Sequence, residues 1–277
     1  MGLTMENQTY TYKYPHPALT ADCVVFGFDG QELRVLLIER DIDPYKGRWA
    51  LPGGFVRIDE TVESCAQREL EGETGLHLSH LEQLKVFSGV DRDPRERVVT
   101  VAFYALARNA EVRGGDDARN AQWFSLTELP SLAFDHETIL SEALERIKQD
   151  IHFHPVGFDL LGDTFTMPQL QRLYEAILGV QFDRRNFHKK MLQLGILEQE
   201  EDEKTEMENV HRFFFGESRE MCSKSINELF VEPQLAYHER LSHDASVKST
   251  GRKGKRYRFN KEKYDLLKEK GISHFEF

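Results

Sequence analysis

Cysteine and long hydrophobic runs are both scarce in this 277-residue chain, and each shortage narrows the class of protein. The three cysteines, Cys23, Cys65 and Cys222, are far apart and do not show metal-ligand spacing. An odd number of scattered cysteines argues against a disulfide framework and predicts free thiols in a reducing compartment. No apolar stretch reaches the roughly 20 residues of a transmembrane helix, and the N-terminal sequence lacks the apolar core of a signal peptide. The sequence therefore predicts a cytoplasmic protein with no membrane partner.

Net positive charge is missing as well. The chain holds 36 Lys and Arg against 47 Asp and Glu, which gives a formal net charge of −11. This balance argues against a uniformly basic nucleic-acid binder, although it leaves room for local basic segments. Two such segments occur, at 184–190 and 252–258. The length suggests two domains, each able to bury its own core, and we place them at residues 1–154 and 155–277.

Apolar runs in the first 150 residues predict a mixed sheet that is followed by a helix. Two long runs on either side of an Asp29-Gly30 turn predict a β-hairpin. Further β-rich runs and a closing amphipathic segment follow, and this order fits an α/β/α sandwich. The predicted strands include 19–28, 32–40, 84–90 and 97–108, and the predicted closing helix is 136–150.

One segment between these strands contains the candidate functional residues. Residues 54–76 read GFVRIDETVESCAQRELEGETGL. Their spacing matches the Nudix box, G-x5-E-x7-R-E-U-x-E-E-x-G-U, at every fixed position but one. After the opening glycine, the matched positions are Glu60, Arg68, Glu69, Glu73, Gly75 and Leu76. The exception is Gly72, which stands where the box has the first glutamate of its E-E pair. The alternative is a glutamate-rich solvated helix face, which the preceding WALPGG and the number of matched positions disfavour.

The spacing of the box has a physical reason. The predicted helix runs from about Thr61 to Thr74, with Asp59 or Thr61 as its N-cap and Gly75 at its end. Glu69 and Glu73 are one turn apart on that helix, so their carboxylates project from one face. A Gly53-Gly54 turn at the start of the box lets the backbone approach this face closely. Mg²⁺ favours a few carboxylates together with phosphate oxygens and water, and this arrangement suits that preference.

Gly72 bears on whether the site still catalyses. It removes one hard oxygen ligand and places a glycine inside a helix, at a cost of about 1 kcal/mol relative to alanine. Glu71 points about 100° away on the helix and does not substitute for the missing side chain. Hydrolysis at a metal site depends on each ligand's position, whereas binding a diphosphate demands less. We therefore predict a retained pocket, with Glu69 and Glu73 at the catalytic positions and weak or no turnover.

Beyond Pro155 the pattern changes to short helices. An amphipathic helix is predicted over 166–179, and a second helix begins at an Asp183 N-cap. A tight turn joins them and the second helix is basic, which is typical of a helix-turn-helix. A strand over 195–199 and a later basic segment before a closing strand and helix complete a winged helix. The alternative is a helical appendage with solvated charges. The residues predicted to contact DNA are Arg184, Arg185, His188, Lys189, Lys190, Arg252, Lys253, Lys255 and Arg256.

Six segments together carry a family resemblance. They are YPHPALTADCVVF, GRWALPGGFV, DRDPRERVVTVAFYAL, LAFDH, FTMPQLQRLYEAILG and RNFHKK. They resemble the Nudix-related transcriptional regulators of the NrtR and AraR type, and the resemblance covers nearly the whole chain except an insertion at about 200–249. It implies an α+β chain in which a Nudix α/β/α sandwich with a mixed sheet precedes a winged helix-turn-helix domain. It also implies a homodimeric repressor.

The resemblance implies roles for single residues as well. It implies that Glu69, Glu73 and the Gly53 carbonyl bind the metal and the phosphate. It also implies an ion pair between Glu60 and Arg68 that stabilises the box. The ligand-binding residues that it implies are Gly53, Gly54, Arg68, Arg92, Asp93 and Arg95.

These observations predict a dimeric DNA-binding regulator. Its first domain senses a nucleotide sugar such as ADP-ribose, or a sugar, and Mg²⁺ accompanies a diphosphate ligand. The alternative is a working Mg²⁺-dependent ADP-ribose pyrophosphatase that uses Glu69 and Glu73, and a third possibility is a scaffold for protein contacts. The basic helix and wing favour the regulator, because a small-molecule hydrolase has no use for them.

Overall fold

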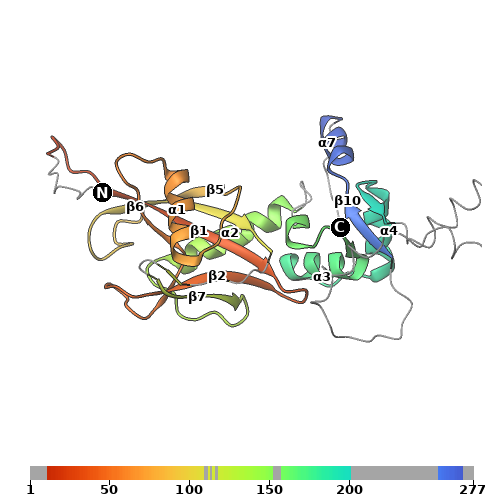
Figure 1. Cartoon of the computed structure of the whole chain (residues 1–277), viewed down its shortest axis with the longest axis horizontal. Helices are drawn as coiled ribbons and strands as arrows, with labels where there is room; N and C mark the ends of the chain where they lie inside the picture. The colour runs from red at the N-terminus through yellow and green to blue at the C-terminus, as the bar shows by residue number, and fades with distance from the viewer. Residues whose placement is uncertain are drawn as a thin grey trace, which may run out of the picture.

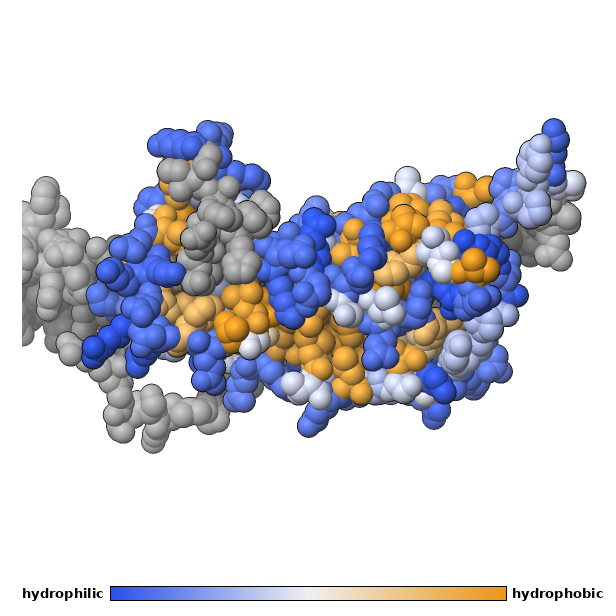
Figure 2. Space-filling view, turned by 180° about the vertical axis from the view of Figure 1, so that it is seen from behind, coloured by the Kyte–Doolittle hydropathy of each residue, from blue (hydrophilic) through white to orange (hydrophobic). Residues whose placement is uncertain are grey.

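A computed structural model of the chain describes residues 11–108, 112, 114–115, 118–151, 157–200 and 255–270. A larger domain built on a sheet is followed by a smaller, mainly helical domain (Figure 1). None of the helices in this part of the chain has the length and apolarity needed to span a bilayer. Seen from behind, hydrophobic side chains gather in patches on the larger domain, whereas the smaller domain is mainly hydrophilic (Figure 2).

The larger domain contains a mixed seven-stranded sheet. Its central order is β3-β2-β1-β6-β5, with β4 paired to β1 and β7 paired to β2. Strands β1 and β6 are parallel, and the other pairings are antiparallel. The strands are β1 Ala18–Phe28, β2 Leu33–Arg40, β3 Trp49–Ala50, β4 Gly53–Phe55, β5 Glu82–Phe87, β6 Val98–Leu106 and β7 Ala118–Ser125. The predicted hairpin and mixed sheet are confirmed.

Two helices cover opposite faces of this sheet. Helix α1, Val62–Thr74, lies over one face, and α2, His136–Asp150, crosses behind the other (Figure 1). Because side chains alternate along a strand, Cys23 and Val25 of β1 pack in the same core cluster as Leu70 of α1. Their neighbours on the strand, Val24 and Phe26, share the other cluster with α2. The predicted α/β/α sandwich is therefore confirmed.

The local signals around the box helix act largely as predicted, with one correction. Of the two N-cap candidates, Thr61 is the one used, and its hydroxyl accepts a hydrogen bond from the Ser64 N–H. Gly75 ends the helix in the left-handed region with φ 70°, which glycine adopts without steric cost. The prediction of a turn at Gly53-Gly54 is wrong. These glycines form β4, antiparallel to β1, because the lack of side chains lets this strand lie directly against β1 and the box helix.

The smaller domain has the predicted helix-turn-helix. Helix α3 is stabilised by a capping box between Thr166 and Gln169, and the carboxylate of Asp183 caps α4 by accepting from the Asn186 N–H. Strands β8, β9 and β10 form a three-stranded antiparallel sheet beside these helices, with β10 in the middle. The elements are a 3-10 turn Phe158–Leu160, β8 Phe165–Thr166, α3 Met167–Leu178, α4 Arg184–Gln193, β9 Leu197–Gln199, β10 Arg256–Phe259 and α7 Lys261–Glu269.

The two domains share one hydrophobic core. Ile147 at the end of α2 and Ile151 just after it belong to the same buried cluster as Leu173 and Ile177 of α3. The domain boundary predicted near residue 154 lies outside the described residues, as do Cys222, Arg252, Lys253 and most of the insertion (201–249). These predictions stay predictions.

Candidate ligand pocket and nucleic-acid interface

A cavity of about 330 Å³ opens where β1, β4, α1, the β5–β6 loop and the segment before α2 meet. All eight residues predicted for the ligand and metal site line it. They are Gly53, Gly54, Arg68, Glu69, Glu73, Arg92, Asp93 and Arg95. The sequence spreads these residues over more than 40 positions, and the fold brings them to one cavity.

An arginine braces the box helix on one side of this cavity. Nε of Arg68 donates to Oε2 of Glu60 over 2.9 Å, and its Nη2 donates to Oε1 over 2.6 Å. Its Nη1 also donates to Oε1 of Glu69 over 2.5 Å. These hydrogen bonds lower the pKa of Glu60 to about 2, so Glu60 stays ionised. The ion pair predicted between Glu60 and Arg68 is present, and it orients Glu69 as well.

The two glycines of β4 let the carboxylates reach the backbone. A Cβ atom on Gly53 would lie 2.4 Å from the Ala21 carbonyl oxygen, and one on Gly54 would lie 2.4 Å from Oε1 of Glu69. Neither position tolerates a side chain without displacing its neighbours. The N–H of Gly53 donates to Oε2 of Glu73 over 2.9 Å. Close approach of the β1 backbone therefore requires glycine at position 53, whereas a side chain at position 54 would displace the Glu69 carboxylate.

Glu73 is the most strongly perturbed acid in the cavity. Burial, reinforced by the charges of Glu69 and Asp22, outweighs the hydrogen bond from Gly53 and raises the pKa of Glu73 to about 8. A divalent cation would offset this clustering of negative charge, so the donor set fits Mg²⁺. The described residues contain no group of three or more His, Cys, Asp and Glu side chains arranged to hold a metal ion. Mg²⁺ held by two glutamates and the Gly53 carbonyl would thus take its remaining ligands from water and phosphate, as it commonly does.

We expect stability without a cation to fall as pH rises from the ordinary glutamate value of 4.5 towards 8. In this window the folded state keeps the Glu73 proton and the unfolded state loses it, so rising pH favours unfolding by up to about 5 kcal/mol. Urea unfolding in EDTA from pH 5 to pH 8 measures the effect. Glu73→Gln should flatten the pH dependence, while Glu71→Gln, at an exposed site on the same helix, should not. Parallel curves for wild type and Glu73→Gln would contradict the assignment.

Aromatic and cationic side chains also line the cavity. The Arg95 guanidinium lies 5.1 Å from the ring centroid of Phe55 and 5.5 Å from that of Phe134, and Arg40 lies 4.9 Å from Phe134. Asp93 accepts hydrogen bonds from Nε and Nη2 of Arg95 and fixes its plane. Although burial opposes it, this pairing holds the pKa of Asp93 below its usual value. The cavity thus presents positive charge and ring faces side by side, which suits a ligand with phosphate and a planar base.

Several pocket residues were missed by sequence reasoning. Asp22, Arg40, Phe134 and His136 all line the cavity, and Asp135 lies just behind its wall. Asp22 could have been found from the sequence, since it is the one charged residue in the 11-residue apolar strand β1. The LAFDH segment was noticed only for its resemblance. His136 is buried, and this lowers its pKa; its Nδ1 accepts a hydrogen bond from the Leu51 N–H over 2.9 Å.

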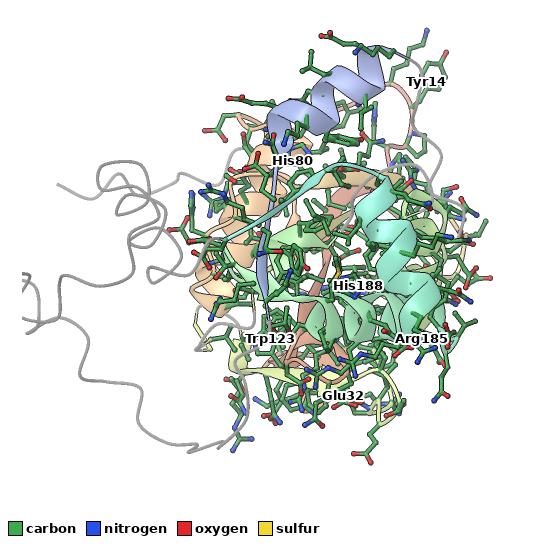
Figure 3. All side chains as sticks on the ribbon, turned by 90° about the vertical axis from the view of Figure 1, so that its right-hand side faces the viewer. Tyr14, Glu32, His80, Trp123, Arg185 and His188 are labelled. Atoms are coloured by element: carbon green, nitrogen blue, oxygen red, sulfur yellow. The ribbon has the colours of Figure 1, made fainter. Side chains whose placement is uncertain are left out.

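A second candidate site is the outer face of α4. Arg184, Arg185, Lys189 and Lys190 are exposed on this helix, while Phe187 and Met191 are buried beneath it. Figure 3 shows Arg185 at the outer side of α4 and His188 on the side that faces the domain. His188 is half-buried, with its ring 6.3 Å from that of Tyr257 in β10. The arrangement presents four basic side chains to solvent and makes His188 a poorer candidate for DNA contact than predicted.

The described basic residues of the predicted wing, Lys255 and Arg256, have polar or acidic partners in the fold. The segment 252–258 contains no acidic residue, but acids face it from elsewhere in the fold. Arg256 lies 3.6 Å from Glu200 and donates to the Thr164 hydroxyl, and Lys255 donates to Gln199. Pairing of β10 with β9 brings Glu198 and Glu200 beside the basic residues, which spacing along the chain did not reveal.

Comparison with known proteins supports both domains. The family model for the Nudix domain matches residues 16–146, and that for the NrtR DNA-binding winged helix domain matches residues 157–213. The ADPR responsive transcriptional repressor NtrR of Acinetobacter baylyi is 34% identical over 196 residues, which are 69% of this chain and 78% of the repressor. The ADP-ribose pyrophosphatase of Methanocaldococcus jannaschii is 43% identical over 129 residues, or 47% of this chain and 74% of the enzyme. The crystal structure of Shewanella oneidensis NrtR complexed with a 27mer DNA matches with a TM-score of 0.56 and 30% identity, over 66% of this chain and 88% of that chain.

Proposed function

Because the chain belongs to the NrtR family of Nudix-related transcriptional regulators, we propose that it binds DNA and that its Nudix domain senses a nucleotide sugar, with ADP-ribose as the first candidate. One observation carries the proposal. A Nudix pocket with its carboxylates in place shares a hydrophobic core with a winged helix whose α4 presents four exposed basic side chains. A hydrolase of small molecules does not need a winged helix with an exposed basic helix.

The chemistry of the pocket supports a diphosphate ligand that carries a base. Glu69 and Glu73 attract phosphate only through a cation, whereas Arg95 attracts it directly. Phe55 and Phe134 offer ring faces for a planar group. Mg²⁺, when bound, supplies the positive charge that lets the two glutamates hold a diphosphate. We assign its protein ligands to Glu69, Glu73 and the Gly53 carbonyl.

A homodimer is part of the proposal. Helix-turn-helix proteins commonly bind palindromic sites as symmetric dimers, with one half-site for each protomer. The larger domain carries exposed apolar side chains that a second copy could cover, among them Ile58, Val86 and Val90. Sedimentation of the full chain tests it.

We expect ADP-ribose binding to depend on Mg²⁺ and on Arg95. Arg95→Ala should weaken affinity about 10- to 150-fold, because it removes a cation whose hydrogen bonds to phosphate are worth about 1.5–3 kcal/mol. Calorimetry with Mg²⁺ and with EDTA measures both effects. Arg34→Ala, which breaks the Arg34–Asp29 pair in the β1–β2 hairpin, is the matched control. Binding of an uncharged sugar without regard to Mg²⁺ would instead identify a sugar sensor. No binding of either ligand class would refute the sensor.

The second candidate function is a Mg²⁺-dependent ADP-ribose pyrophosphatase. The 43% identity to the Methanocaldococcus jannaschii enzyme favours it, together with the retained Glu69 and Glu73. Gly72 disfavours it because one acidic ligand of the box is missing.

A further inference from the structure

The N-terminal end of α2 is held by an unusual ion pair. Asp135 stands at the N-cap position of α2, yet its side chain makes no capping hydrogen bond. Both of its oxygens instead accept from Arg92, over 3.0 Å from Nε and 2.7 Å from Nη2. An N-cap aspartate usually stabilises its own helix by accepting from the N–H groups of the first turn. Here the Asp135 carboxylate pairs with Arg92 instead of capping its own helix.

Arg92 also faces the ligand pocket. Its side chain is only 4% exposed, it lines the cavity, and its Nη2 lies 3.5 Å from Oδ2 of Asp22. A guanidinium in this position can bind either the Asp135 carboxylate or an anionic group of a ligand in the cavity. A phosphate offers the same planar, bidentate recognition as a carboxylate.

The residue before Asp135 is strained. Phe134 has φ 53°, which is rare for a bulky residue, and Tyr45 is the other non-glycine residue with positive φ in the described ranges. The two rings are in edge-to-face contact with centroids 4.9 Å apart. Backbone strain of this kind persists where the surroundings enforce it and can be released when they change. Phe134 lines the pocket as well, so a bound ligand changes those surroundings.

The other end of α2 lies in the core shared with the DNA-binding domain. Ile147 and Ile151 pack in one cluster with Leu173 and Ile177 of α3. Helix α3 in turn contacts α4 through an edge-to-face pair of Tyr174 and Phe187, whose centroids are 5.7 Å apart. The helix has 15 residues, so it spans about 22 Å from the pocket to this core. Helix α2 thus joins the pocket to α3, and strand β2, which also lines the pocket, contacts α3 as well.

We propose that Arg92 exchanges Asp135 for an anionic group of the bound ligand, and that α2 passes this exchange on to the DNA-binding domain. Once released, Asp135 caps the first turn of α2, the segment at Phe134 rearranges, and the shift of α2 repositions α3 and α4. The inference rests on the proposed function and specifies how its two sites are coupled. It makes Asp135 a positioning residue that touches neither ligand nor DNA.

The test compares DNA affinity of the full chain with and without saturating ADP-ribose, on a duplex selected from a random library. Coupling of this kind typically changes affinity 5- to 150-fold. Asp135→Asn keeps a good N-cap but removes the charge that holds Arg92, so the ratio of the two affinities should fall below about two while ADP-ribose still binds. Glu142→Gln removes the ion pair of α2 with Lys85 and should keep the wild-type ratio.

A second variant and a hydrogen-exchange measurement test the proposed exchange independently. Asp135→Ser is an uncharged N-cap and should behave like Asp135→Asn. In wild type, hydrogen exchange of the backbone amides in the first turn of α2 should slow when ADP-ribose binds. Wild-type coupling that survives both substitutions, or unchanged exchange in that turn, overturns the inference and leaves the proposed function intact. A wild type that binds ADP-ribose with no effect on DNA affinity overturns the proposed sensing itself.

Discussion

Replacing Lys189 by glutamate is expected to weaken binding to duplex DNA by about 100-fold or more, because it turns a phosphate-attracting charge into a repelling one in each protomer. Lys189 is exposed on α4, one turn from Arg185 and away from the buried Phe187–Met191 side. Fluorescence anisotropy over a range of salt concentrations measures the loss. Lys46→Glu, at an exposed lysine of the larger domain, makes the same charge change away from the interface and should have little effect.

The salt dependence separates the roles of the basic residues. Each lost phosphate contact should flatten the slope of log K against log salt by about one unit. We expect a smaller change for Arg256, because its guanidinium already faces Glu200. Arg185 should instead relax preference at one half-site position, at about 1–3 kcal/mol if it contacts a base bidentately. Unaltered binding by Lys189→Glu, with no motif enriched from random duplex, would remove the support for DNA binding.

Restoring the missing acid is expected to raise catalysis. Wild type should hydrolyse ADP-ribose very slowly or not at all with Mg²⁺, and Gly72→Glu should increase the rate about 10- to 100-fold, since a metal ligand contributes to transition-state charge stabilisation of several kcal/mol. Single-turnover assays with Mg²⁺ and Mn²⁺, which detect release of AMP, are sensitive enough. The loop at Gly115 contacts this point of the helix, because a Cβ on Gly115 would lie 2.4 Å from the Gly72 carbonyl oxygen.

Two further variants show whether the added carboxylate is responsible. Gly72→Ala removes the helix glycine without adding a ligand, so it should stabilise the fold by up to about 1 kcal/mol and leave the rate unchanged. Glu73→Gln should abolish any activity that Gly72→Glu creates. AMP release by wild type at ordinary enzyme rates, lost in Glu73→Gln, would instead establish the pyrophosphatase as the working function.

The sequence predicted those features correctly that depend only on residues close together along the chain, such as helix caps. The caps at Thr61, Gly75 and Asp183 are where the residue types predict them, because capping involves residues within one helical turn. The brace between Glu60 and Arg68 followed from the family resemblance, and its hydrogen bonds are present. The strand at Gly53-Gly54 was mistaken for a turn because glycine is common in both, and only its pairing with β1 distinguishes them.

By itself, the sequence determined that this protein has a Nudix helix with two carboxylates on one face, a helix-turn-helix and an acidic overall charge, since these depend on composition and short-range spacing. The tertiary structure decided which partner each charged group meets. It placed Asp22 beside Glu73, Asp135 on Arg92, and Glu200 against Arg256. These pairs join residues 43 to 56 positions apart, and Coulomb interactions act over a few ångströms in space whatever the separation along the chain.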